Sequence, residues 1–69
     1  MRADDEREAA MNRLPTPYST ALRLREAGLP DEFIADAVGI EPEGVGLLLR
    51  VGAEKLATAL RRPAVSSLD

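Results

Sequence analysis

The sequence of 69 residues contains no cysteine, no histidine and no tryptophan, and it has only one phenylalanine and one tyrosine. Without cysteine there is no disulfide framework and no thiolate metal site, and without histidine the usual zinc sites cannot form. So few aromatic rings also leave out the stacking platforms that bind single-stranded nucleic acid. We therefore expect an intracellular domain without a metal or cofactor, whose core is built from Leu, Val, Ile and Ala.

Long apolar runs are missing as well. Residues 1–14 mix charges of both signs, unlike the basic and then apolar start of a secretory signal. The apolar stretches are too short to span a bilayer. The sequence thus predicts a cytoplasmic protein without membrane contact, and its length leaves room for one domain with a modest core.

The overall charge is acidic, with a formal net charge of -3 and a pI of about 4.9. Residues 42–62 form a positive segment, because they hold four basic and two acidic side chains. Domains that depend on phosphate contacts usually have a strongly basic surface. The composition therefore argues against tight DNA binding by this chain alone.

The pattern of apolar residues predicts an all-α fold, a small bundle of three to four helices. Residues 4–14 suit a short helix, with acids at its start and Arg13 near its end. Because their apolar stripe is thin, residues 1–14 are either a docked helix or a frayed arm. Residues 15–62 form the main domain, and residues 63–69 are expected to be a flexible tail.

Three further helices are expected within the main domain. The second runs from Pro17 or Tyr18 to Ala27, with Gly28 as its left-handed terminator. The third begins around Pro30 and ends at Gly39. Its buried face is expected to hold Phe33, Ile34, Ala37 and Val38. The longest covers residues 42–62, and its core face is expected to hold Val45, Leu49, Gly52, Leu56, Ala59 and Leu60, with Leu48 at the edge.

The third and fourth of these helices, with the short turn at Gly39 and Ile40 between them, form a helix-turn-helix pattern. In the order and spacing of its residues, the chain resembles region 4 of extracytoplasmic-function-type sigma factors. The residues that carry the resemblance are Leu14-Pro15, Ala21–Leu29, Ile34–Ile40, Val45, Leu49 and Glu54-Lys55-Leu56. The resemblance covers residues 14–60 and is strongest over 21–40. It implies a four-helix module whose last helix reads a promoter, while other faces contact RNA polymerase or an anti-sigma protein.

The chain departs from that family where bases would be read. The family's recognition helix carries hydroxyl, Lys and Arg side chains. In this chain most of those positions hold Gly, Leu, Val or Ala, and only Arg50 keeps a polar side-chain group. Glycine and leucine side chains cannot pair with base edges. Lys55, Arg61 and Arg62 remain as candidates for phosphate contacts that position DNA without specifying its sequence. They are better explained as solvated charges near a helix C-terminus, where the dipole favours cations.

A second stripe on the longest helix lies beside the core face and is small or apolar. Glycine inside a helix costs roughly 1 kcal/mol relative to alanine, so the glycines of this helix call for a compensating contact. We interpret Gly44, Leu47, Leu48 and Val51, continued by Thr58, as a candidate interface for a homodimer or a regulator. The alternative is that the N-terminal helix covers Leu48 and Val51.

Two functions follow from these patterns. The first is a transcription-associated module with weak or partner-assisted binding to double-stranded DNA. The alternative is a protein-interaction or dimerisation module that kept the fold and lost base readout. An enzyme is not expected, because without His or Cys the chemistry would fall to carboxylates, lysine or tyrosine, and nothing in the sequence clusters them. No phosphate loop or metal-ligand spacing is present, and the acids Asp31, Glu32 and Asp36 suit a helix start and a solvated face.

Overall fold

The computed structural model describes the backbone of residues 3–61 and the side chains of residues 5–61. Four α-helices and a turn of 3-10 helix account for most of this range, and it contains no strand. The all-α prediction is therefore confirmed. In chain order the elements are α1 (Ala3–Arg13), α2 (Thr16–Glu26), α3 (Asp31–Val38), η1 (Pro42–Gly44) and α4 (Val45–Arg61).

The ends of α2 follow from two prolines and a glycine. The Pro15 carbonyl accepts the N–H of Tyr18 at 3.0 Å, so α2 begins at Thr16, one residue before the expected start. Pro17 fits there because the first turn of a helix leaves its N–H groups without helical partners. The helix ends at Glu26, because Gly28 adopts a left-handed φ of 85°. Ala27 therefore lies just outside α2 rather than within it.

The turn after α3 changes the start of the last helix. Gly39 has a left-handed φ of 79°, and the N–H of Ile40 donates to the Ala35 carbonyl at 3.0 Å. The N–H of Gly44 then donates to the Glu41 carbonyl at 2.9 Å, three residues back, which is the bonding of a 3-10 helix. The expected single helix over 42–62 is thus wrong at its start. Two residues of η1 are consistent with the tighter turn, because Pro42 has no N–H and Gly44 has a poor helix propensity.

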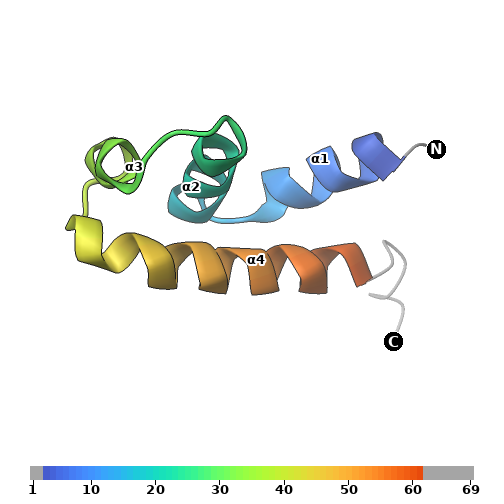
Figure 1. The fold of residues 1–69 in the computed structure, drawn as a ribbon. Helices are drawn as coiled ribbons and strands as arrows, with labels where there is room; N and C mark the ends of the chain where they lie inside the picture. The colour runs from blue at the N-terminus through green and yellow to red at the C-terminus, as the bar shows by residue number, and fades with distance from the viewer. Residues whose placement is uncertain (1–2, 62–69) are drawn as a thin grey trace.

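The helices form two layers. In Figure 1, α1, α2 and α3 lie in a row along one side of α4. The middle helix of the row, α2, packs on both α3 and α4, and α1 packs on α4. The view looks along the axis of α3 while α4 runs across it, so these two helices cross at a large angle, as in a helix-turn-helix. None of the helices in residues 3–61 is long and apolar enough to cross a membrane.

The core consists of two apolar clusters that meet α2 at adjacent residues, Leu22 and Ala21. The α1-side cluster joins α1, α2 and α4 through Ala10, Met11, Leu22 and Leu56. The α3-side cluster joins α2, α3 and α4 through Ala21, Ile34, Ala35 and Val45. Leu49 packs against both clusters. The predicted core face of α4 is correct at Val45, Gly52 and Leu56, which are buried.

Three residues that were expected in the core are exposed. Phe33 is 52% exposed and Ala37 is also exposed, because the inner face of α3 is centred on Ile34, Ala35 and Val38. Leu60 is 46% exposed. At about 100° per residue it lies some 40° further round α4 than Leu56, away from the buried line.

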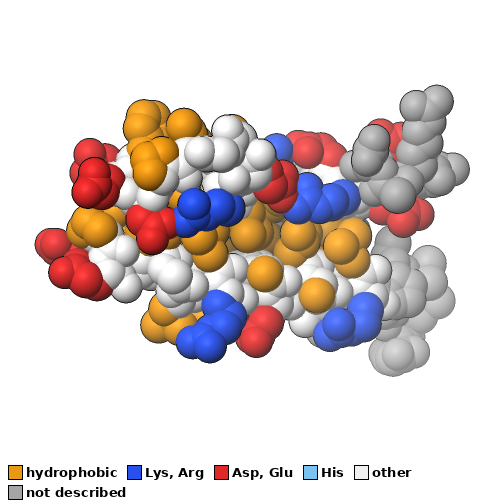
Figure 2. Space-filling view, viewed as in Figure 1, with side chains coloured by type: hydrophobic (Ala, Val, Ile, Leu, Met, Phe, Trp, Pro, Cys, Tyr) orange, Lys and Arg blue, Asp and Glu red, His pale blue; other side chains and the backbone are white. Residues whose placement is uncertain are grey.

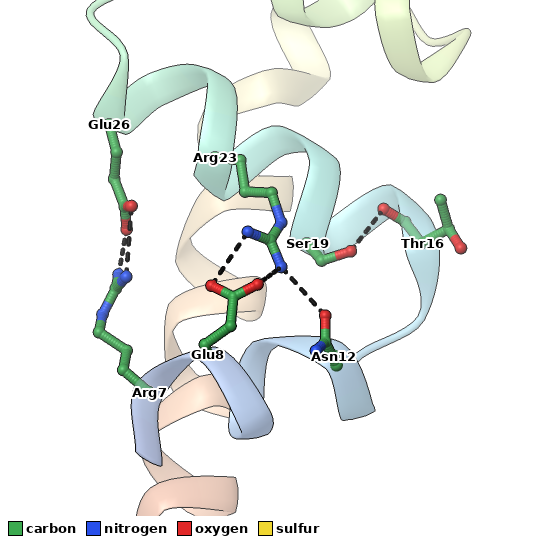
Figure 3. A network of polar contacts seen from close by, with 7 residues as sticks. All are labelled: Arg7, Glu8, Asn12, Thr16, Ser19, Arg23 and Glu26. Carbon is green, nitrogen blue, oxygen red and sulfur yellow. Dashed lines mark hydrogen bonds and ion pairs between the residues drawn. The ribbon is translucent and has the colours of Figure 1, made fainter. Parts of the chain in front are cut away.

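Helix α1 is docked against the rest of the domain, which resolves the choice between helix and frayed arm. Met11 is 1% exposed and Ala10 is 3% exposed. Ion pairs also join α1 to α2, because Arg7 pairs with Glu26 and Arg23 pairs with Glu8 (Figure 3). The expected tail over 63–69 lies outside the described residues.

Gly52 is buried where α4 packs on α2. A Cβ atom at this position would lie 3.4 Å from the Leu22 Cδ1 atom and 3.4 Å from the Tyr18 Cβ atom, which is ordinary van der Waals contact. A methyl group would therefore just fit at this position, whereas a larger side chain would overlap with α2.

Candidate interaction surface on α4

The residues of the predicted interface stripe differ in their exposure and in the elements that cover them. Leu47 is 59% exposed, the largest exposure among the exposed large apolar residues. Leu48 is half-buried and packs against the α3-side cluster, so α2 and α3 cover it rather than α1. Gly44 lies in η1 and is half-buried beside Ile40. Val51 is half-buried beside the turn between α1 and α2.

The candidate DNA-binding residues of α4 are exposed but do not form one cluster. Arg50, Lys55 and Arg61 are all exposed, while Arg62 lies outside the described residues. The Lys55 Nζ atom lies 5.4 Å from the centre of the Tyr18 ring, within range of a cation–π contact. Arg61 donates a hydrogen bond to the Thr58 hydroxyl at 3.4 Å. At about 100° per residue, Lys55 lies on a different side of α4 from Arg50 and Arg61.

The end of the molecule formed by α3 and η1 is acidic. Figure 2 shows acidic side chains gathered there, next to apolar ones. In a helix-turn-helix the N-terminal residues of the second helix contact base edges. Carboxylates at that end would repel DNA phosphates and occupy the positive end of the helix dipole. Its exposed acids are Asp31, Glu32, Asp36, Glu41 and Glu43.

A shallow hollow of about 460 Å³ lies between the α1–α2 turn and the middle of α4. Its apolar lining comes from Leu14, Pro15 and Val51. Two cations, Arg13 and Lys55, also line it. We call this feature the Arg13–Lys55 hollow; Glu54 and Thr58 complete its lining.

The charges around this hollow differ from those elsewhere on the layer of α1, α2 and α3. Arg7 and Arg23 form ion pairs with carboxylates across the α1–α2 contact (Figure 3), and Arg25 forms one with Asp31. Within residues 5–61, neither Arg13 nor Lys55 has a carboxylate oxygen within 4.0 Å. Neither cation is neutralised by an ion pair there, although the Lys55 ammonium also lies over the Tyr18 ring.

The ion pairs shift the acid–base properties of α1. Hydrogen bonding from the Arg23 guanidinium lowers the pKa of Glu8 below its usual range, against a smaller opposing effect of desolvation. Two bonds carry this interaction, at 3.2 Å and 2.8 Å, and the same guanidinium donates to the Asn12 side-chain oxygen at 3.1 Å. The Glu8 carboxylate in turn raises the pKa of Arg23. This network fixes α1 on α2 and uses none of the side chains that line the hollow.

Sequence reasoning placed Val51 and Lys55 in two separate sites and did not single out Arg13. The structure brings the three residues together at the Arg13–Lys55 hollow. The signal that could have found this arrangement is the pair of prolines at 15 and 17, which turns the chain back toward α4 directly after Arg13. Periodicity along one helix contains no information about such a contact between helices.

No group of three acidic side chains within the described part of the chain is arranged to hold a metal ion. No family model, no curated protein and no solved structure matches the chain. The resemblance to sigma factor region 4 therefore stays a prediction.

Proposed function

We propose that this chain is a protein-interaction module with a helix-turn-helix fold that does not read DNA bases by itself. The observation that carries the proposal is the outer side of the first turns of α4. There Leu47 is 59% exposed and Glu43 and Gly46 lie at the surface, so Arg50 is the one side-chain donor on this side. An exposed leucine can be buried by a protein partner but cannot pair with a base edge.

The proposed contact surface continues from Leu47 along α4. Residues three, four and seven positions apart share one side of a helix, which places Val51, Glu54 and Thr58 in line with Leu47. All three of these residues line the Arg13–Lys55 hollow. A partner that covers Leu47 would therefore also meet the hollow.

The proposal is tested by the molar mass of the chain in solution, measured by sedimentation equilibrium. We expect a mass above that of one chain, which the Leu47→Asp variant reduces toward one chain because a buried unpaired carboxylate is unfavourable. Glu6→Gln is the control, since it changes an exposed polar residue of α1, away from Leu47. A monomeric parent chain whose mass increases only when duplex DNA is added would overturn the proposal.

A second candidate function is weak, partner-assisted contact with double-stranded DNA in a transcription complex. It is favoured by Arg50, Lys55 and Arg61, exposed cations of α4 that form no ion pair within the described residues. Such contacts release counter-ions, so the affinity for duplex DNA should fall steeply as salt rises. Fluorescence anisotropy with a labelled duplex at low and moderate salt measures this effect, and no binding at low salt would discard the candidate.

A further inference from the structure

The outer side of α3 carries an exposed apolar group surrounded by acids. Phe33 is 52% exposed, and Ala37, one helical turn later, is also exposed. Glu32 and Asp36 form a neighbouring exposed row with the same spacing of four residues. We call these four residues the Phe33 surface.

The Phe33 surface and the Arg13–Lys55 hollow are complementary in two respects. The hollow offers an apolar lining from Leu14, Pro15 and Val51, which matches an aromatic side chain. It also offers two cations without a carboxylate partner within the described residues, which match the acids around Phe33. A cation close to an aromatic face adds a further attraction.

The shape of the hollow is compatible with this occupant. It is a shallow, open depression of about 460 Å³, which can receive a side chain from a neighbouring protein surface. A DNA phosphate would fit it less well, because a phosphate has no apolar part for Leu14 and Val51.

Within one chain the two features are far apart. Figure 1 places α3 at one end of the molecule, while the α1–α2 turn lies beside the middle of α4. The two features can therefore meet only between chains. Such a contact is heterologous, because each copy would use its Phe33 surface on one neighbour and its hollow on another.

We propose that the Arg13–Lys55 hollow binds the Phe33 surface of a second copy of this chain, so that the molecules associate head to tail. This inference rests on the proposed function, for which it names the partner. Head-to-tail contacts close into a ring or continue as a chain of copies. The mass in solution should therefore rise with protein concentration beyond that of a dimer, and added salt should weaken the association.

Charge and shape are tested by two variants, each with a matched control. Lys55→Glu reverses a charge in the hollow and should weaken association by at least about tenfold. Arg50→Glu makes the same change on α4 outside the hollow and should stay within about twofold. Phe33→Ser should also weaken association by about tenfold, whereas Leu60→Ser, at a residue exposed to a similar degree, should not. Circular dichroism checks that each variant remains helical.

Mixing the two defective variants gives the sharpest test. Lys55→Glu keeps an intact Phe33 surface, and Phe33→Ser keeps an intact hollow. At a concentration where each variant alone is monomeric, an equimolar mixture should therefore form a 1:1 dimer and stop there, because one intact contact remains. Light scattering after gel filtration measures both results.

Three outcomes would overturn the inference: a mixture that stays monomeric, an Arg50→Glu variant as defective as Lys55→Glu, or a parent chain that is monomeric at every concentration. If association depends on Leu47 but not on Lys55 or Phe33, the proposed interaction function stands and the head-to-tail contact is wrong. If the chain does not associate and binds DNA, both fail.

Discussion

Two glycines of α4 lie in different surroundings, and their substitution should have opposite effects. A Cβ atom at Gly46 would meet nothing within 4 Å, whereas one at Gly52 would touch Leu22 and Tyr18 at 3.4 Å. We expect Gly46→Ala to stabilise the domain by about 0.5–1 kcal/mol, because alanine loses less backbone entropy in a helix. Gly52→Val should destabilise it by about 1–3 kcal/mol through overpacking. Urea unfolding of both variants measures the two free energies, and equal effects would contradict the close contact at Gly52.

The contact between Glu8 and Arg23 should make stability depend on pH. The Arg23 guanidinium, with Arg7 as a second nearby cation, lowers the pKa of Glu8 in the folded chain. A carboxylate with a lowered folded pKa stabilises the fold fully above its unfolded pKa, about 4.3, and the contribution is lost as pH falls through the folded value.

The Glu8→Gln variant should therefore have a lower Tm than the parent chain at pH 7, and the difference should shrink below about pH 4. Thermal unfolding at a series of pH values measures it. Glu6→Gln is the control, because Glu6 is exposed on α1 and takes part in no ion pair of the described residues. A difference that is constant with pH would show that Glu8 acts through something other than its charge.

At the scale of elements, α1 depends on a few contacts. Its helical pattern is weak, and its buried side chains are Ala10 and Met11. We expect Met11→Ala to destabilise the domain by about 2–5 kcal/mol, because the side chain is almost completely buried. That is a large part of the stability of a small domain, about 5–15 kcal/mol in total.

Chemical denaturation and the exchange of α1 amide protons measure this effect. Glu6→Ala, at an exposed position of the same helix, should change stability by less than about 0.5 kcal/mol. If Met11→Ala had an effect as small as that of Glu6→Ala, α1 would contribute little to the core.

The elements themselves could be predicted because their signals are local. Prolines at helix starts, Gly28 and Gly39 at helix ends and the spacing of Ile34 and Val38 act within one or two turns of helix. The exposure of Phe33 and Leu60 could not be predicted in the same way. It depends on which side of each helix the neighbouring helices cover, and a helical repeat alone leaves an uncertainty of one position in either direction.

The candidate site was predictable only in part for the same reason. The sequence identified Leu47, Val51 and Lys55 along one helix, but the Arg13–Lys55 hollow also needs residues 13–15, which are distant in sequence from α4. Their position depends on how the α1–α2 turn packs, and this is a property of the tertiary fold. The loss of base-reading side chains on α4 was visible in the sequence, because it requires only the identity of each residue.

At the scale of the whole molecule, the two core clusters should unfold together. Leu49 packs against both of them, so its side chain connects the α1 end of the domain to the α3 end. We expect Leu49→Ala to destabilise the domain by about 2 kcal/mol, at the lower end of the range for leucine because the residue is only half-buried. Hydrogen exchange should accelerate in α1 and α3 alike, and calorimetry should still show one transition, as for other small domains.

Leu60→Ala, at a leucine that is 46% exposed, is the control and should leave exchange nearly unchanged. Faster exchange confined to α1 or to α3 would mean that each cluster is stable without the other and that Leu49 does not couple them.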